Sequence, residues 1–390
     1  MTAPSKRLTV AIIIDTCEPL YHGGYEARAW SLAKRLTQWA DVSIFTSSPR
    51  PFSLDGVNFV PVMQATPHFH ADGFRDLKRS IAFTLALLPH IPSLRHFDII
   101  DCNATPFVQV FAAALAARIG HPKLVVTAHE ALGPTFGPYF RARRAPFPQV
   151  ASRIAHLLYF ASQRLGDSLV AASAIAGAEL EREGFAGVTV ISGGVESVWR
   201  PRPLHTGRLV FTGRLVPNKH VDILIRAFAE LNAQGRATTL TLIGDGPLRL
   251  DLERLTQELS LSESVCFAGA VDESRKLHLL RDRADLFVSA SVREGISLAT
   301  LEALSQGLPV VVSSKETGSR NGALEYVTIS NGRVADGSAE SIAAAVRDVF
   351  ASQAGYAGLS KGAIETANRY DWHRVAWDLY QHYRKLCETS

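Results

Sequence analysis

The sequence predicts an α/β protein built from two successive doubly wound domains. Short apolar segments without polar alternation recur along the chain, segments with apolar residues at helical spacing lie between them, and the pattern restarts near residue 200. Apolar runs without alternation are typical of parallel strands that are covered on both faces. Strands that alternate with helices form a sheet with helices on both sides. The length of 390 residues accommodates two such domains.

The first half of the chain contains the expected elements of one domain. The expected strands are Leu8–Asp15, Asp41–Thr46, Phe97–Asp101, Lys123–Ala128, Ser168–Ala172 and Val188–Ile191. The expected helices, in which apolar residues recur at helical spacing, are Glu26–Ala40, Thr105–Ile119 and Gln149–Gly166.

The pattern restarts after the proline-interrupted stretch 199–203. The expected strands of this half are Arg208–Thr212, Thr238–Ile243, Val265–Ala268, Leu286–Val288, Pro309–Val312 and Asn331–Val334. The expected helices are Val221–Gln234, Pro247–Leu259, Ser274–Arg283, Leu298–Gln306 and Ala339–Ser352. A final helix, about Trp372–Leu386, has an apolar face that must pack on another part of the protein.

Composition and charge exclude several classes of protein. With 41 basic and 37 acidic side chains, the net charge is only +4, so we expect no nucleic-acid binding. The whole surplus lies in residues 1–200, which hold 19 basic and 15 acidic side chains, whereas residues 201–390 hold 22 of each. The N-terminus has no signal-peptide pattern, and no apolar stretch has the length of a membrane span. We therefore expect a cytoplasmic protein.

The strongest candidate site is the segment from Arg293 to Glu302, which follows an expected strand. Glu294 should lie at the carboxyl end of that strand, where α/β sheets bind ligands, and Glu302 should lie about two helical turns further on. The amides of Ile296, Ser297 and Leu298 would be unpaired donors of the first helical turn, suited to an anion or to sugar hydroxyls. Alternatively, the two glutamates are a helix-dipole partner and a solvated side chain.

A second candidate is the basic loop after strand Arg208–Thr212. Arg214 and Lys219 lie five positions apart, and together they offer a guanidinium fork and a point charge to a diphosphate. The alternative is a basic surface turn.

Two further candidates lie in the first half. Gly23 and Gly24 follow the first strand, where glycines let backbone amides approach a phosphate, although such a pair is often only a turn. His129 ends the apolar strand Lys123–Ala128 and should point toward a sugar or phosphate, although a single histidine is often structural.

Several catalytic and binding motifs are missing from the sequence, and their absence limits the reactions that we expect. The chain has no GxGxxG, no P-loop and no HExxH. The one GxSxG string, Gly358–Gly362, is expected between two helices rather than at a nucleophile elbow. The pair His68 and His70 is better explained by a polar loop than by a metal site. There is no Asp-x-Asp, the pattern by which nucleotide-sugar enzymes hold a divalent ion, so we expect metal-independent chemistry with no cofactor.

Taken together, the motifs resemble the retaining GT-B glycosyltransferases of family 4, the glycogen-synthase and mannosyltransferase type. The segments that carry the resemblance are Ile191–Glu196, Phe211–Lys219, Gly244–Pro247, Val265–Gly269, Glu294–Glu302, Gly307–Val311 and Asp371–Trp372. The resemblance implies two Rossmann-like domains facing a deep cleft. Residues 1–200 would form the acceptor-side domain, joined by the returning helix at about 370–390, and residues 201–369 would bind the nucleotide-sugar.

The resemblance also implies which residues bind the diphosphate and the ribose of the donor. Arg214 and Lys219 would hold its diphosphate, Gly23 and Gly24 would face the diphosphate from the first domain, and Glu302 would accept from the ribose hydroxyls.

The remaining assignments concern the donor sugar and the base. Glu294 would bind the sugar hydroxyls near the reacting carbon, with the first-turn amides beside it, and His129 would contact the sugar from the opposite wall. The strand end at Gly269 would receive the base through its backbone.

The resemblance implies transfer of a hexose from a nucleotide-sugar to a lipid-linked or glycan acceptor, in cell-envelope glycan or glycolipid synthesis. Two alternatives remain: a GT-B enzyme acting on a small metabolite or natural product, and a catalytically silent GT-B binding protein. Basic segments beside apolar ones, Phe140–Arg144 and Arg75 to Arg79 ahead of Ile81–Leu88, suggest a peripheral contact with anionic lipid or else a solvated loop and an ordinary helix.

Overall fold

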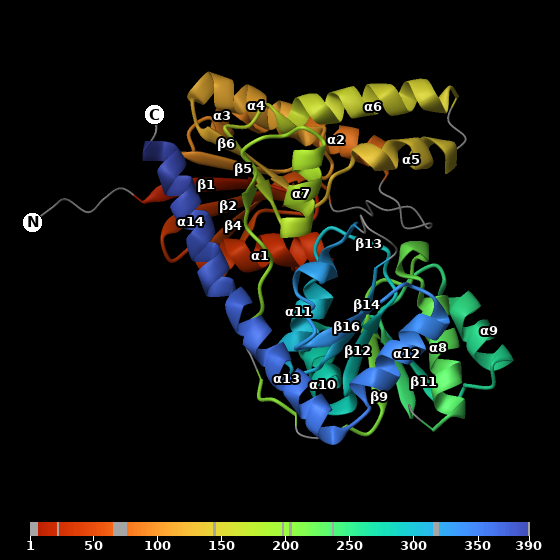
Figure 1. Cartoon of the computed structure of the whole chain (residues 1–390). Helices are drawn as coiled ribbons and strands as arrows, with labels where there is room; N and C mark the ends of the chain where they lie inside the picture. Colours follow the sequence, from red (N-terminus) through yellow and green to blue (C-terminus); the bar gives the residue numbers. More distant parts are fainter. Residues whose placement is uncertain are drawn as a thin grey trace, which may run out of the picture. The chain divides into compact units, whose positions relative to one another are not determined.

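The computed structural model divides the chain into two compact units (Figure 1). It describes residues 7–21, 23–64, 76–142, 146–196, 199–202, 205–235, 238–314 and 320–388. Among these, the N-terminal unit comprises residues up to Gly193 together with Trp372–Glu388, and the C-terminal unit comprises Gly194–Asp371. The histidine pair at 68 and 70, Arg75, and the arginines at 143 and 144 lie outside the described residues.

The N-terminal unit is built on one mainly parallel sheet in the order β3-β4-β2-β1-β5-β6-β7-β8. Its strands are β1 (Leu8–Ile13), β2 (Ala40–Ser47), β3 (Phe52–Leu54), β4 (Val57–Met63), β5 (Ile99–Asn103), β6 (Lys123–Ala128), β7 (Ser168–Ala171) and β8 (Thr189–Val190). The hairpin of β3 and β4 was not predicted. It turns at Asp55 and Gly56, both with positive φ, and β3 is antiparallel to β4.

Helices cover this sheet (Figure 1). They are α1 (Gly24–Leu36), α2 (Leu77–Leu87), α3 (Ile91–Leu94), α4 (Gln109–Gly120), α5 (Phe136–Ala142), α6 (Pro148–Gln163), α7 (Ala174–Arg182) and α14 (Trp372–Glu388), with short 3₁₀ turns at Leu88–His90 and Gly133–Thr135. The C-terminal helix α14 packs on α1, and α4 packs on both α2 and α6.

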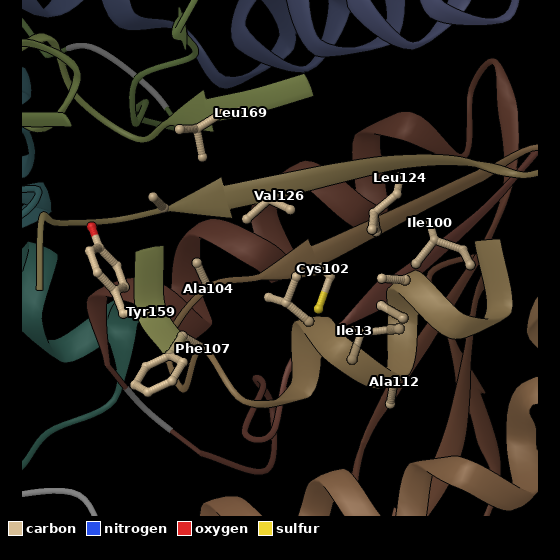
Figure 2. Close-up of a cluster of buried hydrophobic side chains, with 14 of the residues drawn as sticks. Ile13, Ile100, Cys102, Ala104, Phe107, Ala112, Leu124, Val126, Tyr159 and Leu169 are labelled. Atoms are coloured by element: carbon tan, nitrogen blue, oxygen red, sulfur yellow. The ribbon is translucent and has the colours of Figure 1, made fainter. Parts of the chain in front are cut away.

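The core of the N-terminal unit lies between the sheet and these helices. Figure 2 shows Ile13, Ile100, Cys102, Leu124 and Val126 projecting from adjacent strands into one apolar cluster. All five are at most 1% exposed. Burial of each large aliphatic side chain stabilises the fold by about 1.5–3 kcal/mol, so this cluster holds the strand ends in a fixed register.

The C-terminal unit repeats the plan with a parallel sheet in the order β11-β10-β9-β12-β14-β16. Its strands are β9 (Arg208–Thr212), β10 (Thr239–Ile243), β11 (Val265–Gly269), β12 (Leu286–Ser289), β14 (Val310–Ser313) and β16 (Gly332–Ala335), and a separate two-stranded pair is formed by β13 (Arg293–Glu294) and β15 (Arg320–Asn321). Its helices are α8 (Val221–Ala233), α9 (Arg249–Glu258), α10 (Glu273–Arg283), α11 (Leu298–Ser305), α12 (Ala339–Val349) and α13 (Gln353–Ala367), with 3₁₀ turns at Pro217–Lys219, Gly322–Glu325 and Asn368–Tyr370. The predicted α/β class with two doubly wound sheets is confirmed.

One local prediction was wrong. Gly358–Gly362 does not lie between helices but inside α13. Ser360 is fully buried there, accepts a hydrogen bond from the amide of Arg202, and donates its hydroxyl to the carbonyl of Gly307 at 2.6 Å. The serine therefore joins α13 to neighbouring segments. It lies within a helix and not at the strand-to-helix turn of a nucleophile elbow.

Candidate functional site

The loop that carries Arg214 is held by direct packing of backbone on backbone. A Cβ added at Gly244 would lie 2.0 Å from the carbonyl oxygen of Gly213, and one added at Gly246 would lie 2.4 Å from that of Leu215. The amide of Leu215 donates to the carbonyl of Asp245 at 2.9 Å. The two glycines after β10 thus have a physical role that their spacing in the sequence did not reveal: they let their loop pack directly against the Arg214 loop.

Lys219 and Glu294 lie together in the structure. Lys219 ends the 3₁₀ turn Pro217–Lys219, and its Nζ lies 2.6 Å from Oε1 of Glu294. Both side chains are largely buried, at 20% and 11% exposure. The two strongest sequence motifs therefore meet at the carboxyl ends of β9 and β12, where open α/β sheets bind their ligands.

Three partners keep Glu294 ionised. Burial alone would raise the pKa of this carboxyl, but the ammonium of Lys219 and hydrogen bonds from the hydroxyls of Ser291 and Ser297 outweigh burial and lower the pKa below its ordinary value. Ser297 thus has a side-chain role that was not predicted for it. The site presents a fixed negative charge next to a fixed positive one.

The turn from Glu294 leads into α11, with Ser297 as the N-cap residue. Ile296 and Leu298 are each 7% exposed and anchor the turn in the core, and the hydroxyls of Ser297 and Thr300 lie 2.8 Å apart. The amide of Thr300 donates to the carbonyl of Ser297 at 3.1 Å, and the amides of Leu298 and Ala299 have no acceptor within α11, which begins at Leu298. They are suited to an anion or to sugar hydroxyls beside Glu294.

Glu302 has a cationic neighbour that the sequence analysis did not find. Lys276 on α10 lies 2.9 Å from Glu302 and 2.7 Å from Glu273. Burial would lower the pKa of Lys276, but the two carboxylates outweigh burial and raise it, so the lysine stays charged. The lysine has no motif around it, and only the packing of α10 beside α11 brings it to Glu302.

Asn321 is a second residue that sequence reasoning missed. It pairs with Glu294 in the β13–β15 ladder and is fully buried. Its Nδ2 donates to the carbonyls of Ser291 at 2.8 Å and Ser313 at 2.9 Å. One amide thus ties the segment that carries Glu294 to the end of β14.

Gly269 lies at the carboxyl end of β11, as predicted. Its φ of +72° is in the region that favours glycine, and its carbonyl accepts a hydrogen bond from the amide of Gly244 at 2.8 Å. The strand end therefore adjoins the loop that supports Arg214, and it exposes backbone there instead of a side chain.

In the N-terminal unit, Gly23 and Gly24 mark the start of α1. Gly23 is its N-cap with an extended φ of −179°, a conformation open to any residue, so backbone strain does not explain the glycine. A Cβ added at Gly24 would meet nothing within 4 Å. One added at Gly23 would lie 2.3 Å from Oε2 of Glu26, so this glycine leaves room for a carboxylate that lies at the start of α1.

His129 lies immediately after β6 and is 1% exposed. Its Nε2 lies 3.0 Å from Nδ2 of Asn103, which must be the donor, so Nε2 is the acceptor nitrogen. Tyr25 stacks on the imidazole with ring centroids 4.2 Å apart, and its hydroxyl donates to Glu130 at 3.1 Å. Asn103 and Tyr25 were not predicted. They fix the ring of His129 at the carboxyl edge of the sheet, on the same side as the start of α1.

The fold and these strand-end clusters define a class of protein: two Rossmann-like units with cations, carboxylates and helix N-termini gathered where such sheets bind nucleotides. Two family models match the chain, "Glycosyl transferases group 1" over residues 201–366 and "Glycosyltransferase Family 4" over residues 22–198. Together they span both units. The chain belongs to the GT-B glycosyltransferases of the family 4 type.

Similar proteins include enzymes and a solved structure of this fold. A region is 34% identical to the GDP-mannose-dependent alpha-(1-6)-phosphatidylinositol dimannoside mannosyltransferase of Mycobacterium tuberculosis, covering 43% of this chain and 41% of that protein. Another is 31% identical to glycogen synthase of the same organism, covering 58% of this chain and 56% of that protein. The matches thus span about half the length of these relatives. Sucrose-phosphate synthase from Thermosynechococcus elongatus has the same fold, with a TM-score of 0.80 and 20% identity over 98% of this chain and 100% of that chain.

The helices also bear on membrane insertion. Across the described residues, none is both long and apolar enough to cross a bilayer.

Proposed function

We propose that the protein is a retaining glycosyltransferase that moves a hexose from a nucleotide-sugar to a lipid-linked or glycan hydroxyl. The observation that carries the proposal is the contact of Lys219 with Glu294 at the strand ends, next to the first turn of α11. A cation and helix-end amides suit a diphosphate, and a carboxylate held ionised suits sugar hydroxyls. The mannosyltransferase and glycogen-synthase relatives support this choice of donor and acceptor classes.

The reaction breaks the bond between the anomeric carbon and the diphosphate, and the electron pair stays on the diphosphate oxygen. The acceptor hydroxyl forms the new bond on the same face of the sugar, and its proton passes to the departing phosphate oxygen. Arg214, Lys219 and the first-turn amides of α11 stabilise the negative charge that develops on the diphosphate, so no divalent metal is required. Ionised Glu294 binds hydroxyls of the donor sugar beside the positively charged carbon.

The remaining roles follow the same assignment. Glu302 accepts from the ribose hydroxyls, and the backbone at Gly269 receives the base. In the N-terminal unit, His129 contacts the donor sugar and the amides after Gly23 and Gly24 contact the diphosphate. We place the reaction in the cytoplasm, in cell-envelope glycan or glycolipid synthesis, with a peripheral contact to the membrane.

The first experiment is a panel of UDP-, GDP- and dTDP-sugars read out by thermal shift. We expect one nucleotide class to raise the melting temperature in the presence of a metal chelator. If no nucleotide stabilises the protein, the transferase proposal fails. If stabilisation requires a divalent metal, metal independence fails.

A second experiment tests the diphosphate assignment with variants. Arg214→Ala and Lys219→Ala should each weaken binding of the stabilising nucleoside diphosphate about tenfold or more, because each removes a charge-assisted contact. Arg254→Ala is the matched control, since Arg254 lies on the exposed surface of α9 and pairs with Asp251. Unchanged affinity in both site variants contradicts the assignment.

Stereochemistry is tested separately. The anomeric configuration of the product, compared with that of the donor by NMR, should be the same. An inverted product excludes a retaining reaction while leaving the nucleotide-sugar proposal intact.

A further inference from the structure

Helix α2 presents an apolar stripe to solvent. Leu77, Ile81, Leu85 and Leu88 are 40%, 45%, 60% and 41% exposed and recur at intervals of three or four along one face. The opposite face packs into the core through Phe83 and Leu87, which are fully buried. A helix that is apolar on its outer face as well as its inner one needs a further apolar surface to cover it.

Helix α6 has the same property. Val150, Ile154, Leu157 and Leu158 are 54%, 53%, 68% and 44% exposed, whereas Tyr159 is fully buried in the core. The exposed residues again follow helical spacing, so they form a stripe along most of the helix.

Helix α4 connects the two stripes. Leu115 and Ile119, four positions apart on α4, are 45% and 50% exposed. Because α4 packs on α2 and on α6, the three helices form a layer on one side of the sheet (Figure 1). We call the exposed apolar side chains of these helices the α2–α4–α6 surface. Most of the exposed large hydrophobic side chains in the described residues lie on it or at its edge.

The charged side chains of these helices are all basic, and one acidic residue, Asp76, lies beside them as the N-cap of α2. Helices α2 to α6 contain no aspartate or glutamate, and Lys78, Arg118 and Arg153 are exposed next to the apolar stripes. The positive surplus of residues 1–200 is therefore concentrated where the apolar side chains are. A surface of exposed hydrophobic and cationic side chains is complementary to the headgroups and upper acyl region of an anionic bilayer.

We propose that the α2–α4–α6 surface docks the N-terminal unit on an anionic lipid bilayer. This inference rests on the proposed function only in that a membrane surface is where a lipid-linked acceptor would be found. The charge pattern argues against a second copy of this chain as the occupant, because the same face of two copies would bring the basic side chains of their helices together. The apolar stripes argue against a purely electrostatic partner, since such a partner would leave them exposed to water.

The test is co-sedimentation of the full chain with vesicles of phosphatidylcholine alone and of phosphatidylcholine with 30% phosphatidylglycerol. We expect binding to the anionic vesicles, weakened as salt shortens the Debye length below about 10 Å, and little binding to the neutral ones. Leu85→Gln combined with Leu157→Gln should lower the anionic partition coefficient at least tenfold. Lys78→Gln should lower it about fivefold, the usual contribution of one cation near such a surface.

Matched controls keep the test independent of folding and of the transferase proposal. Leu250 and Ile329 are 69% and 83% exposed in the C-terminal unit, so Leu250→Gln with Ile329→Gln removes as much exposed apolar surface elsewhere and should leave binding unchanged. Thermal shift by the nucleotide reports the proposed function in every variant. A protein that binds its nucleotide but no anionic vesicles overturns the docking inference alone, whereas vesicle binding without nucleotide binding overturns the transferase alone. Vesicle binding that survives in the Leu85 and Leu157 double variant also overturns the inference, as does concentration-dependent self-association that the double variant abolishes.

Discussion

Lys219 and Glu294, 75 positions apart in the chain, form an ion pair in which Nζ lies 2.6 Å from Oε1. The cation proposed for the donor diphosphate and the carboxylate proposed for the donor sugar are therefore in contact with each other. Lys219 holds Glu294 ionised in a buried position, and our proposal gives it a second role, in which its remaining N–H groups bind the donor diphosphate.

Lys219→Met tests this pairing through its pH dependence. In the parent protein the pKa of Glu294 is lowered, so the carboxylate stabilises the folded unit above its unfolded pKa and loses this contribution as the pH falls through the folded pKa. Without Lys219, burial dominates and raises the pKa of Glu294 in the folded protein. The free energy of unfolding therefore falls as the pH rises above the pKa that Glu294 has in the unfolded chain. We expect a loss of about 2 kcal/mol at pH 7 that shrinks toward pH 4.

Hydrogen exchange of the amides around β12 and α11 measures this difference between variant and parent. Lys361→Met is the control, because Lys361 is 72% exposed and lies 3.8 Å from Glu365 on the surface of α13. A difference between variant and parent that stays constant with pH would show that the ion pair does not set the ionisation of Glu294.

Lys276→Met tests whether Lys276 orients the carboxylate of Glu302. Lys276 lies 2.9 Å from Glu302, and its loss removes a cation that orients this carboxylate. If Glu302 accepts from the ribose hydroxyls, we expect affinity for the stabilising nucleoside diphosphate to fall about tenfold, equivalent to about 1.4 kcal/mol. Isothermal titration calorimetry gives the affinity, with Lys361→Met again as control, and equal affinities in variant and parent would refute the support role.

Gly322→Ala tests how firmly Glu294 is positioned. A Cβ at Gly322 would lie 2.7 Å from the carbonyl oxygen of Gly295, next to Glu294, so the turn into α11 must shift to make room. A shift near 1 Å at a reacting centre costs up to about 100-fold in rate. We expect release of nucleoside diphosphate from the stabilising donor to slow at least tenfold, with a smaller change in nucleotide affinity.

The control for this change is Gly358→Ala in α13, where an added Cβ meets nothing within 4 Å. It should leave the release rate unchanged and leave the fold intact. Equal release rates in Gly322→Ala and the parent would show that the turn tolerates displacement.

Local patterns predicted the elements whose signals lie within a few residues. The bounds of β6 and β9 match the prediction because each is an apolar run that ends at polar or glycine residues. Helix α13 was missed because its glycines weaken the helical pattern. Packing explains at least Gly362, since a Cβ there would lie 2.0 Å from the carbonyl of Ser330, so the glycine permits a close approach that no local pattern reveals.

The residues of the candidate site also fall into two groups, those that the sequence could predict and those that it could not. Glu294, Glu302, Arg214 and Lys219 are recognisable because their motifs lie at strand ends. Their supporting residues could not be predicted, because partners such as Lys276 and Asn321 come from other elements and have no motif of their own. Only the packing of α10 beside α11, and of β15 beside β13, brings them into contact with the site.

Tyr383→Phe tests the attachment of α14 to the N-terminal sheet. The hydroxyl of Tyr383 donates to the buried carboxylate of Asp101, which also accepts from Thr127 at 2.6 Å. Burial raises the pKa of Asp101, although these two hydrogen bonds lower it in part. For an acid with a raised pKa, stability falls as the pH rises from the unfolded to the folded value. Loss of the Tyr383 donor raises the pKa further, so α14 should lose about 2 kcal/mol of protection at pH 7 and less near pH 4.

Hydrogen exchange of α14 amides at the two pH values measures this loss. Tyr380→Phe is the matched control, because the Tyr380 ring stacks on Trp39 with centroids 5.6 Å apart and a phenylalanine preserves that contact. We expect its exchange to match the parent at both pH values. Equal protection in Tyr383→Phe and Tyr380→Phe would mean that ring packing alone holds α14, and that the buried hydrogen bond to Asp101 contributes nothing measurable to its attachment.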